Sequence, residues 1–341
     1  MPYECENMEI NFEKYLEGKK ILITGGAGFI GSNLVKRLLQ YNVEKIIIVD
    51  NLSSGSTWLL PESDKIKLYI GSILNNEVLR RAFSEKPNIV YHLAAHFANQ
   101  NSIDHPETDL LVNGLGTLKV FEYSHIAGVK RVVFAGSGCS VYGHKAPLPY
   151  REDMPPTLHY DTPYQIHKLL GELYAYWMHD YYGLPITVVR YFNVYGPGEV
   201  PGKYRNVIPN FIYWAMKGKP LPITGTGEET RDFTYVEDAV DATLRATIVK
   251  EAIGEAFNIA SGKEIKIIEL AKMINELTGN PSGVIFKSRR DWDRSIRRRA
   301  SIEKAKKILG YEPKVEFKEG LKRTVQWFKE NWELIEKYAR F

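Results

Sequence analysis

Six short segments rich in β-branched residues alternate with longer segments of helical period over roughly the first 190 residues. Continuous apolar strands that alternate with helices are typical of a parallel sheet covered by helices on both faces. The sequence therefore predicts an α/β fold with a doubly wound parallel sheet, and such sheets bind ligands beyond the carboxyl ends of their strands. The predicted strands are residues 20–24, 45–50, 66–71, 88–94, 131–136 and 186–192.

Composition argues against several classes of protein. The chain has 341 residues, and 45 Lys and Arg against 41 Asp and Glu leave a formal charge of +4, so we expect no general nucleic-acid binder. No apolar run approaches the roughly 18 residues that cross a bilayer, and the N-terminal segment has no apolar signal-peptide core, so we expect no membrane partner. Cys5 and Cys139 are the only cysteines, which favours a cytoplasmic protein without disulfides.

A glycine-rich turn follows the first predicted strand, in the segment ILITGGAGFIGSNLVKRLL. Gly25 and Gly28 let the backbone turn tightly and approach a dinucleotide diphosphate, and Gly31 lets the next helix pack close to the sheet. Asp50 ends the following strand, where a carboxylate accepts the ribose hydroxyls of an adenosine and repels a 2′-phosphate. The pattern therefore predicts an NAD site and favours NAD over NADP.

The segment YHLAAHFANQNS ends another predicted strand. Its small residues Ala94 and Ala95 leave room for a cofactor to lie against the backbone. The polar residues His96, Asn99 and Asn101 are equally compatible with ligand contacts and with hydrogen bonds inside the loop.

A tyrosine and a lysine stand four residues apart in YQIHK, so Tyr164 and Lys168 lie on one face of a predicted helix. An isolated tyrosine is a poor base at neutral pH, because its ordinary pKa is near 10. A lysine ammonium and a positively charged nicotinamide nearby would stabilise the phenolate. The pair therefore indicates a general base.

Segments along most of the chain carry a resemblance to a known family: TGGAGFIG, DNLSSG, YHLAA, VYG, YQIHK, RYFNVYGPG, RDFTYVEDAV and KAKKILGYEP. The chain resembles the extended short-chain dehydrogenases/reductases, of the NAD-dependent nucleotide-sugar epimerase and dehydratase type, from about Lys19 to about Trp327. The resemblance implies a Rossmann domain that binds NAD and a smaller C-terminal α/β domain that binds a nucleotide-diphospho-sugar, with a UDP-sugar favoured.

By this resemblance, Tyr164 is the catalytic base, and Lys168 orients the nicotinamide ribose and lowers the tyrosine pKa. Asn113, in VNGLGT, matches a structural asparagine near the cofactor. The residues expected to bind the cofactor are Gly25, Gly28, Phe29, Ile30, Gly31, Asp50, Asn51, Ser53, Ser72, Ile73, Leu93, Ala94, Ala95, Asn113, Tyr164, Lys168 and Tyr191.

The resemblance also implies a substrate site in the C-terminal part. Asn193 is expected to contact the nucleotide diphosphate and Arg231 to clamp it, with Val207 nearby. Arg290 and Asp293 resemble a pair that grips phosphate and ribose, which suits a planar guanidinium and a carboxylate.

These two residues belong to a basic run, residues 289–299, that holds six arginines and is open to a second interpretation as a nucleic-acid patch. Two aspartates interrupt the run, and Arg290 already has a ligand by its motif, so we favour the substrate site. We expect the remaining arginines to face solvent or acidic neighbours. No metal-ligand spacing surrounds the histidines, and no metal is expected.

Two positions depart from the family pattern. Ser72 replaces an aspartate that normally meets adenine, so adenine recognition through that side chain is weaker or different. Four residues before Tyr142, where the family has a catalytic serine or threonine, stands Gly138. We expect Ser137 to take this role through a one-residue shift, with Ser140 as the alternative.

The same segment bears on the reaction. The 4,6-dehydratases carry an Asp-Glu pair before the VYG segment and the decarboxylating relatives a glutamate, whereas this chain has Cys139 and Ser140. The simplest remaining chemistry is epimerisation at the sugar C4 through a transient 4-keto sugar, as between UDP-glucose and UDP-galactose. Cys139 is either a packing residue or an acid/base for 3- or 5-epimerisation. A dehydratase or decarboxylase, and a non-catalytic nucleotide sensor, remain alternatives.

We expect residues 1–190, rejoined by about 236–264, to form the NAD domain, and residues 191–235 and 265–341 to form the nucleotide-sugar domain. The helical segments DLLVNGLGTLKVFEY and YQIHKLLGELYAYWMHDYY are too apolar for the surface of a monomer. Together with the resemblance, they predict a homodimer.

Overall fold

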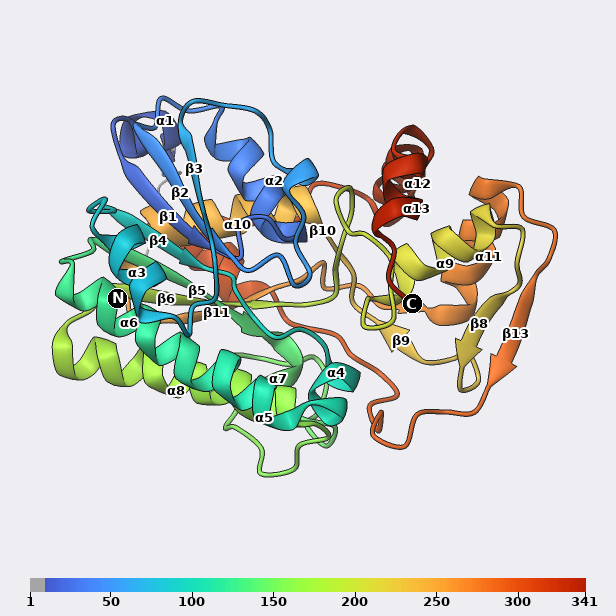
Figure 1. The fold of residues 1–341 in the computed structure, drawn as a ribbon. Helices are drawn as coiled ribbons and strands as arrows, with labels where there is room; N and C mark the ends of the chain where they lie inside the picture. The colour runs from blue at the N-terminus through green and yellow to red at the C-terminus, as the bar shows by residue number, and fades with distance from the viewer. Residues whose placement is uncertain (1–9) are drawn as a thin grey trace.

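A parallel sheet of seven strands forms the centre of the larger lobe (Figure 1). The computed structural model describes residues 10–341, apart from the side chains of Cys139 and Ser140. The strand order is β11-β6-β5-β4-β1-β2-β3. The sheet grows from β1 to one side through β2 and β3 and then to the other side through β4, β5, β6 and β11, as a doubly wound fold requires. The strands are β1 (Lys20–Thr24), β2 (Lys45–Asp50), β3 (Ile66–Ile70), β4 (Ile89–His92), β5 (Arg131–Ser137), β6 (Ile186–Tyr191) and β11 (Ala256–Ile259).

Helices cover both faces of this sheet because its strands are apolar on both sides. In β1, Ile21 and Ile23 belong to one buried cluster and Leu22 to the opposite one. The helices on the first face are α1 (Phe12–Leu16), α2 (Phe29–Leu38) and α10 (Val236–Ile248), and those on the second are α3 (Asn76–Phe83), α6 (Thr117–Ile126) and α8 (Pro163–Tyr182).

Short helices lie at the carboxyl edge of the sheet, where the strands end. Their bounds are η1 (Thr57–Leu59), α4 (Asn99–Asp104), α5 (Pro106–Asp109), the π-helical η2 (Leu110–Gly116), which runs into α6, and α7 (Gly138–Tyr142).

Among the residues that the structure describes, no helix is long and apolar enough to span a membrane.

The smaller lobe has its own buried cluster, formed mainly by residues after 190 (Figure 1). Its strands pair in twos: β7 (Val194–Tyr195) with β10 (Thr234–Tyr235), β8 (Leu221–Thr224) with β13 (Val284–Lys287), and β9 (Thr230–Arg231) with β12 (Ile265–Lys266). The division into two domains stays a prediction. Part of the segment expected in the smaller domain packs in a buried cluster of the larger lobe, through Ala300, Ile302, Ala305, Leu309 and Tyr311. The helices of the smaller lobe are α9 (Val207–Met216), α11 (Ile267–Thr278), α12 (Phe317–Glu330) and α13 (Trp332–Tyr338), and η3 (Lys250–Ala252) and η4 (Ala305–Leu309) lie near α10.

A buried ion pair joins α8 to the sheet. The Arg190 Nε in β6 donates to both carboxylate oxygens of Glu172, at 3.2 and 3.1 Å, and both side chains are at most 5% exposed. Arg190 also donates to the Tyr142 hydroxyl at 2.8 Å, which in turn donates to Asn258 in β11. The network therefore fixes the helix that carries Tyr164 against two strands.

Replacing Glu172 should expose the importance of this network. Glu172→Gln leaves the Arg190 charge buried and unpaired, so the free energy of unfolding should fall by about 3–5 kcal/mol in urea denaturation. The matched control is Glu228→Gln, which removes an exposed pair with Lys266 and should leave the denaturation midpoint nearly unchanged. Equal effects of the two variants would contradict a structural role for the buried pair.

Candidate active site

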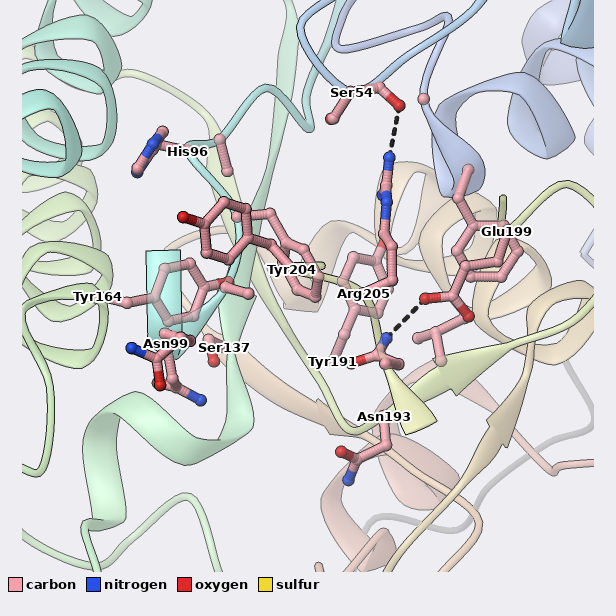
Figure 2. A pocket seen from close by; sticks show the side chains of 18 of the residues that line it. Ser54, His96, Asn99, Ser137, Tyr164, Tyr191, Asn193, Glu199, Tyr204 and Arg205 are labelled. Atoms are coloured by element: carbon pink, nitrogen blue, oxygen red, sulfur yellow. Dashed lines mark hydrogen bonds between the residues drawn. The ribbon is translucent and has the colours of Figure 1, made fainter. Parts of the chain in front are cut away.

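A cavity of about 870 Å³ lies between the two lobes at the carboxyl edge of the sheet. The predicted cofactor residues line it, with the single exception of Asn113, and so do Ser137 and all five predicted substrate residues. Figure 2 shows Tyr164, Asn99 and Ser137 on one side of this pocket and Glu199 and Arg205 on the other. The cavity thus brings together residues from both lobes.

The glycine turn has the geometry that a dinucleotide diphosphate needs. Gly25 has a φ of +74°, and a Cβ on it would lie 2.7 Å from the Ala94 nitrogen. A Cβ on Gly31 would lie 2.2 Å from the Gly25 carbonyl oxygen. Gly28 precedes the first turn of α2, so the amino end of this helix faces the cavity. The residues therefore fit NAD, with its diphosphate at the helix N-terminus.

Asp50 is held in place for a ribose. Its carboxylate accepts hydrogen bonds from the Ala27 and Leu52 backbone nitrogens at 3.0 and 2.8 Å, and it lines the cavity. Burial raises the pKa of Asp50, and these two hydrogen bonds partly offset the rise. Each carboxylate oxygen keeps a lone pair for a ribose hydroxyl, which fits the prediction of NAD.

Asn113 adds one detail to the sequence prediction. It is buried behind the cavity and does not line it. Its amide accepts from the His96 backbone nitrogen at 2.9 Å and donates to the His96 carbonyl at 3.0 Å. Asn113 therefore supports the loop that follows β4.

A second support under this loop was not predicted from the sequence. The buried Asp109 carboxylate lies 3.2 Å from Nδ1 of His96 and 2.7 Å from Nδ1 of His167. His96 belongs to the cofactor loop and His167 precedes Lys168 in α8. Asp109 thus links the loop to the helix of the predicted base, through residues far apart in sequence.

Tyr164 and Lys168 both line the cavity and are 8% and 3% exposed. The Lys168 Nζ lies 4.5 Å from the centroid of the Phe134 ring, and the Phe97 ring meets the Tyr164 ring edge-on at 6.2 Å. Burial lowers the pKa of Lys168 to about 8, against the opposing charges of Asp109 and Glu172. The lysine is therefore mainly a cation at neutral pH, which is compatible with the predicted stabilisation of a Tyr164 phenolate.

Phe192 bears on which serine could supply the catalytic hydroxyl, because its ring lies beside Gly138. A Cβ on Gly138 would lie 2.1 Å from the Phe192 ring, so a side chain at the position where the family has its hydroxyl would require that ring to move. Ser137, the last residue of β5, is 7% exposed and lines the cavity. The side chains of Cys139 and Ser140 lie outside the described residues. The position of Ser137 supports its predicted role.

The other end of the cavity is strongly basic. Arg231 donates to the Asp293 carboxylate at 2.8 Å, and Arg298 donates to the same carboxylate at 3.3 Å. Burial, and then the charge of Arg298, lower the pKa of Arg231 to about 10. Arg290 is exposed and its guanidinium lies 5.6 Å from the Trp292 ring centroid. This cluster of cations suits a diphosphate.

Several lining residues escaped the sequence prediction. Arg289 lines the cavity and has two buried guanidinium nitrogens without a hydrogen-bond partner among the described residues. The sequence motif had pointed only to its neighbour Arg290 as a phosphate ligand. The Trp292 indole donates to Gln100 of α4 at 2.8 Å, and both residues line the cavity. Glu199 is buried in the cavity wall and carried no signal beyond its place after RYFNVYGPG. Among the residues that the structure describes, no group of three or more His, Cys, Asp or Glu side chains is arranged to hold a metal.

Residues 21–260 match the model of the NAD dependent epimerase/dehydratase family. The chain belongs to this family. It is therefore an NAD-dependent enzyme, and NAD is its cofactor, in agreement with the glycine turn and Asp50.

Known relatives match nearly the whole chain. An epimerase structure from Methanothermobacter thermautotrophicus superposes with a TM-score of 0.96 at 55% identity and covers 98% of this chain and 99% of that one. The UDP-glucose 4-epimerase of Thermotoga maritima, solved with UDP-glucose, has a TM-score of 0.86 at 37% identity and covers 92% and 99%. The UDP-glucose 4-epimerase of Mycolicibacterium smegmatis is 35% identical over 91% of this chain and 98% of its own.

Relatives of similar identity carry out different reactions. A UDP-glucuronate 4-epimerase of Thermodesulfobacterium geofontis is 37% identical, and a UDP-N-acetyl-alpha-D-glucosaminuronate decarboxylase of Bacillus cytotoxicus is 35% identical. The family membership therefore establishes a nucleotide-sugar epimerase/dehydratase, while the reaction depends on residues inside the cavity.

The buried charge of Lys168 should lower the free energy of unfolding of the protein. Below pH 8 the lysine is charged in both the folded and the unfolded chain, so its buried charge opposes folding; this cost fades between pH 8 and about 10.5. Lys168→Met should therefore raise the free energy of unfolding of NAD-free protein by about 1–3 kcal/mol at pH 7 and abolish turnover. Urea denaturation at pH 7 and pH 10 measures the difference, which should shrink at the higher pH. Lys322→Met, on the exposed side of α12, is the control, and a destabilised Lys168→Met protein at pH 7 would contradict the prediction.

Proposed function

We propose that this enzyme epimerises a nucleotide-diphospho-sugar, favouring a UDP-sugar, at C4 through a transient 4-keto sugar. The observation that carries the proposal is the placement of Tyr164, Lys168 and Ser137 along one wall of a cavity whose other end is basic. The sequence before VYG has Cys139 and Ser140 where dehydratases have two carboxylates, which favours epimerisation over elimination of water.

In the proposed reaction, Tyr164 removes the proton from the C4 hydroxyl and later returns it. The ammonium of Lys168 stabilises the phenolate, and Ser137 donates a hydrogen bond to the C4 oxygen. Bound NAD supplies reversible acceptance of the C4 hydride. The arginine end of the cavity holds the diphosphate, so the 4-keto sugar can turn without leaving. The hydride then returns to the opposite face of C4, which inverts that carbon, and the proton returns to the oxygen.

The assay is incubation with UDP-glucose, UDP-galactose, UDP-glucuronate and GDP-mannose, followed by NMR of the products. We expect interconversion of a C4 pair without net NADH. Tyr164→Phe should lower turnover at least about 1000-fold, and Ser137→Ala about 10- to 1000-fold, with NAD still bound. Stoichiometric NADH, or loss of water or CO2, would contradict the proposal.

The thiol has its own test, because Cys139 could act at the carbons beside a C4 ketone. The C4 mechanism predicts no deuterium from solvent at C3 or C5 of the product, in the parent enzyme and in Cys139→Ala alike. Deuterium at either carbon in the parent but not in the variant would replace C4 epimerisation by 3- or 5-epimerisation.

We also propose that the enzyme is a cytoplasmic homodimer. Large apolar side chains are exposed along α8 and the neighbouring η2, and a second copy of the chain would cover them. They are Leu110, Leu111, Leu115, Ile166, Leu173, Trp177 and Tyr181, between 43% and 72% exposed.

Light scattering at micromolar concentration should give about twice the 39.0 kDa mass of the chain. Leu173→Glu places a charge on the apolar face of α8 and should yield monomers. Phe286→Glu, at an equally exposed apolar position on β13, should leave the dimer intact. A monomeric parent protein would contradict the proposal.

A further inference from the structure

Residues 197–206, which we call the strap, join β7 to α9 in the smaller lobe. The proposed C4 chemistry uses none of their side chains, although five of them line the cavity. These five are Glu199, Lys203, Tyr204, Arg205 and Asn206. The strap also forms hydrogen bonds with three separate segments of the larger lobe.

The first two contacts are with the segments that follow β1 and β2. The Asn33 amide of α2, the helix after β1, donates to the Pro197 carbonyl at 2.9 Å. A Cβ on Gly198 would lie 3.1 Å from the same amide nitrogen, so the strap backbone lies directly against this helix. In the loop after β2, the Ser54 carbonyl accepts a hydrogen bond from the Arg205 guanidinium (Figure 2).

The third contact is with α4, which comes after β4. Asp104 Oδ2 accepts from the Tyr204 hydroxyl at 2.8 Å and from the Lys203 Nζ at 3.3 Å. Asp104 Oδ1 accepts from the Gln100 amide at 2.9 Å. The hydrogen bonds from Tyr204 and Gln100 lower the pKa of Asp104, so this carboxylate is ionised at neutral pH. Asp104 does not itself line the cavity, so it reaches the cavity only through the side chains that it binds.

The three contacts lie across neighbouring strands of the sheet. The strand order places β1 between β4 and β2, and the glycine turn follows β1. The strap is bonded to α4 on one side of this turn, to the loop after β2 on the other side, and to α2 behind it. Dinucleotides bind at this edge of such a sheet, with the diphosphate at the amino end of the helix. The strap therefore spans the site that the glycine turn forms for NAD.

The strap is fastened to its own lobe by backbone hydrogen bonds. The Asn210 side chain of α9 accepts from the Gly202 nitrogen at 2.9 Å and donates to the Gly202 carbonyl at 3.0 Å. The Lys203 backbone nitrogen donates to the Arg340 carbonyl at 2.7 Å. Because these bonds tie the strap to the smaller lobe, any parting of the two lobes must break its contacts with the larger one.

We propose that the strap is a gate for NAD, whose contacts with the larger lobe must open before the cofactor enters or leaves the cavity. These contacts lie near the surface: the side chains of Lys203 and Asp104 are 59% and 30% exposed. Such contacts are individually weak, so the gate opens without unfolding of either lobe. None of the bonds includes a cofactor atom. Opening therefore limits entry and exit alike, while the affinity at equilibrium depends little on the strap.

The test begins with Asp104→Ala, which removes the acceptor of Tyr204 and Lys203 without changing a side chain that lines the cavity. Exchange of deuterium-labelled NAD from the loaded protein, followed by mass spectrometry after rapid desalting, should be about 5- to 30-fold faster than in the parent. The association rate constant, measured by quenching of protein fluorescence in NAD-free protein, should rise by a similar factor. The dissociation constant from calorimetry should then change by less than about threefold.

The control is Glu107→Ala, which removes an exposed carboxylate of the neighbouring helix α5. Glu107 has no hydrogen bond with the strap in the described part of the chain and does not line the cavity. Its variant should exchange NAD at the rate of the parent.

A second variant, Tyr204→Phe, removes only a hydroxyl group and should speed exchange about 2- to 10-fold. The double variant with Asp104→Ala should exchange no faster than Asp104→Ala alone, because the two side chains act through one hydrogen bond. Additive effects would overturn this role of Asp104, and unchanged exchange in both single variants would overturn the gate.

A further outcome would also overturn the gate: a dissociation constant that rises as much as the release rate while the association rate stays constant. The contacts would then support the shape of the bound site instead of limiting access to it. These measurements need no turnover, so they stand apart from the proposed C4 chemistry.

Discussion

The cofactor site depends on one close approach between two backbone segments. Gly31 in α2 packs against the Gly25 carbonyl so closely that a Cβ would lie 2.2 Å from that oxygen. The same turn lies against Ala94, at the end of β4. Because α2 sits this close to the sheet, its amino end, the end of β2 with Asp50 and the loop after β4 meet at one edge. The position of NAD, and hence the wall left for the substrate, follows from this contact.

Several ionisable groups are buried around the cavity, and their burial lowers the stability of the ligand-free fold. Lys168, Arg231 and Glu199 are buried ionisable groups, and burial is the largest cause of the pKa shift in each. Such groups are retained at functional sites because ligands of opposite charge or matching hydrogen bonds recover the lost solvation. His92 shows the contrast: burial lowers its pKa to about 3, and two threonine hydroxyls hold it as a neutral core residue.

Much of the fold was predictable because its signals are local. The alternation of apolar strands and helices predicted six strands of the sheet, and the glycine turn predicted the cofactor. Asn113 was expected near the cofactor, and the structure adds that its side chain is bonded to the loop after β4, because a motif identifies a position but not the direction of its side chain. Asp109 was missed because its partners His96 and His167 lie 13 and 58 residues away, and Arg289 and Glu199 were missed because the burial of a side chain is not visible in a short stretch of sequence.

The sequence by itself determined the fold class and the cofactor, and it predicted the Tyr164–Lys168 pair, because strand period, glycine spacing and the i,i+4 helical repeat act over a few residues. Only the tertiary structure decided that the Phe192 ring occupies the space that a side chain at Gly138 would need, that Asp109 joins His96 to His167, and that one Glu199 oxygen is buried without a partner among the described residues. The reason is physical: burial and hydrogen-bond satisfaction are set by packing between elements, and no short stretch of sequence contains those partners.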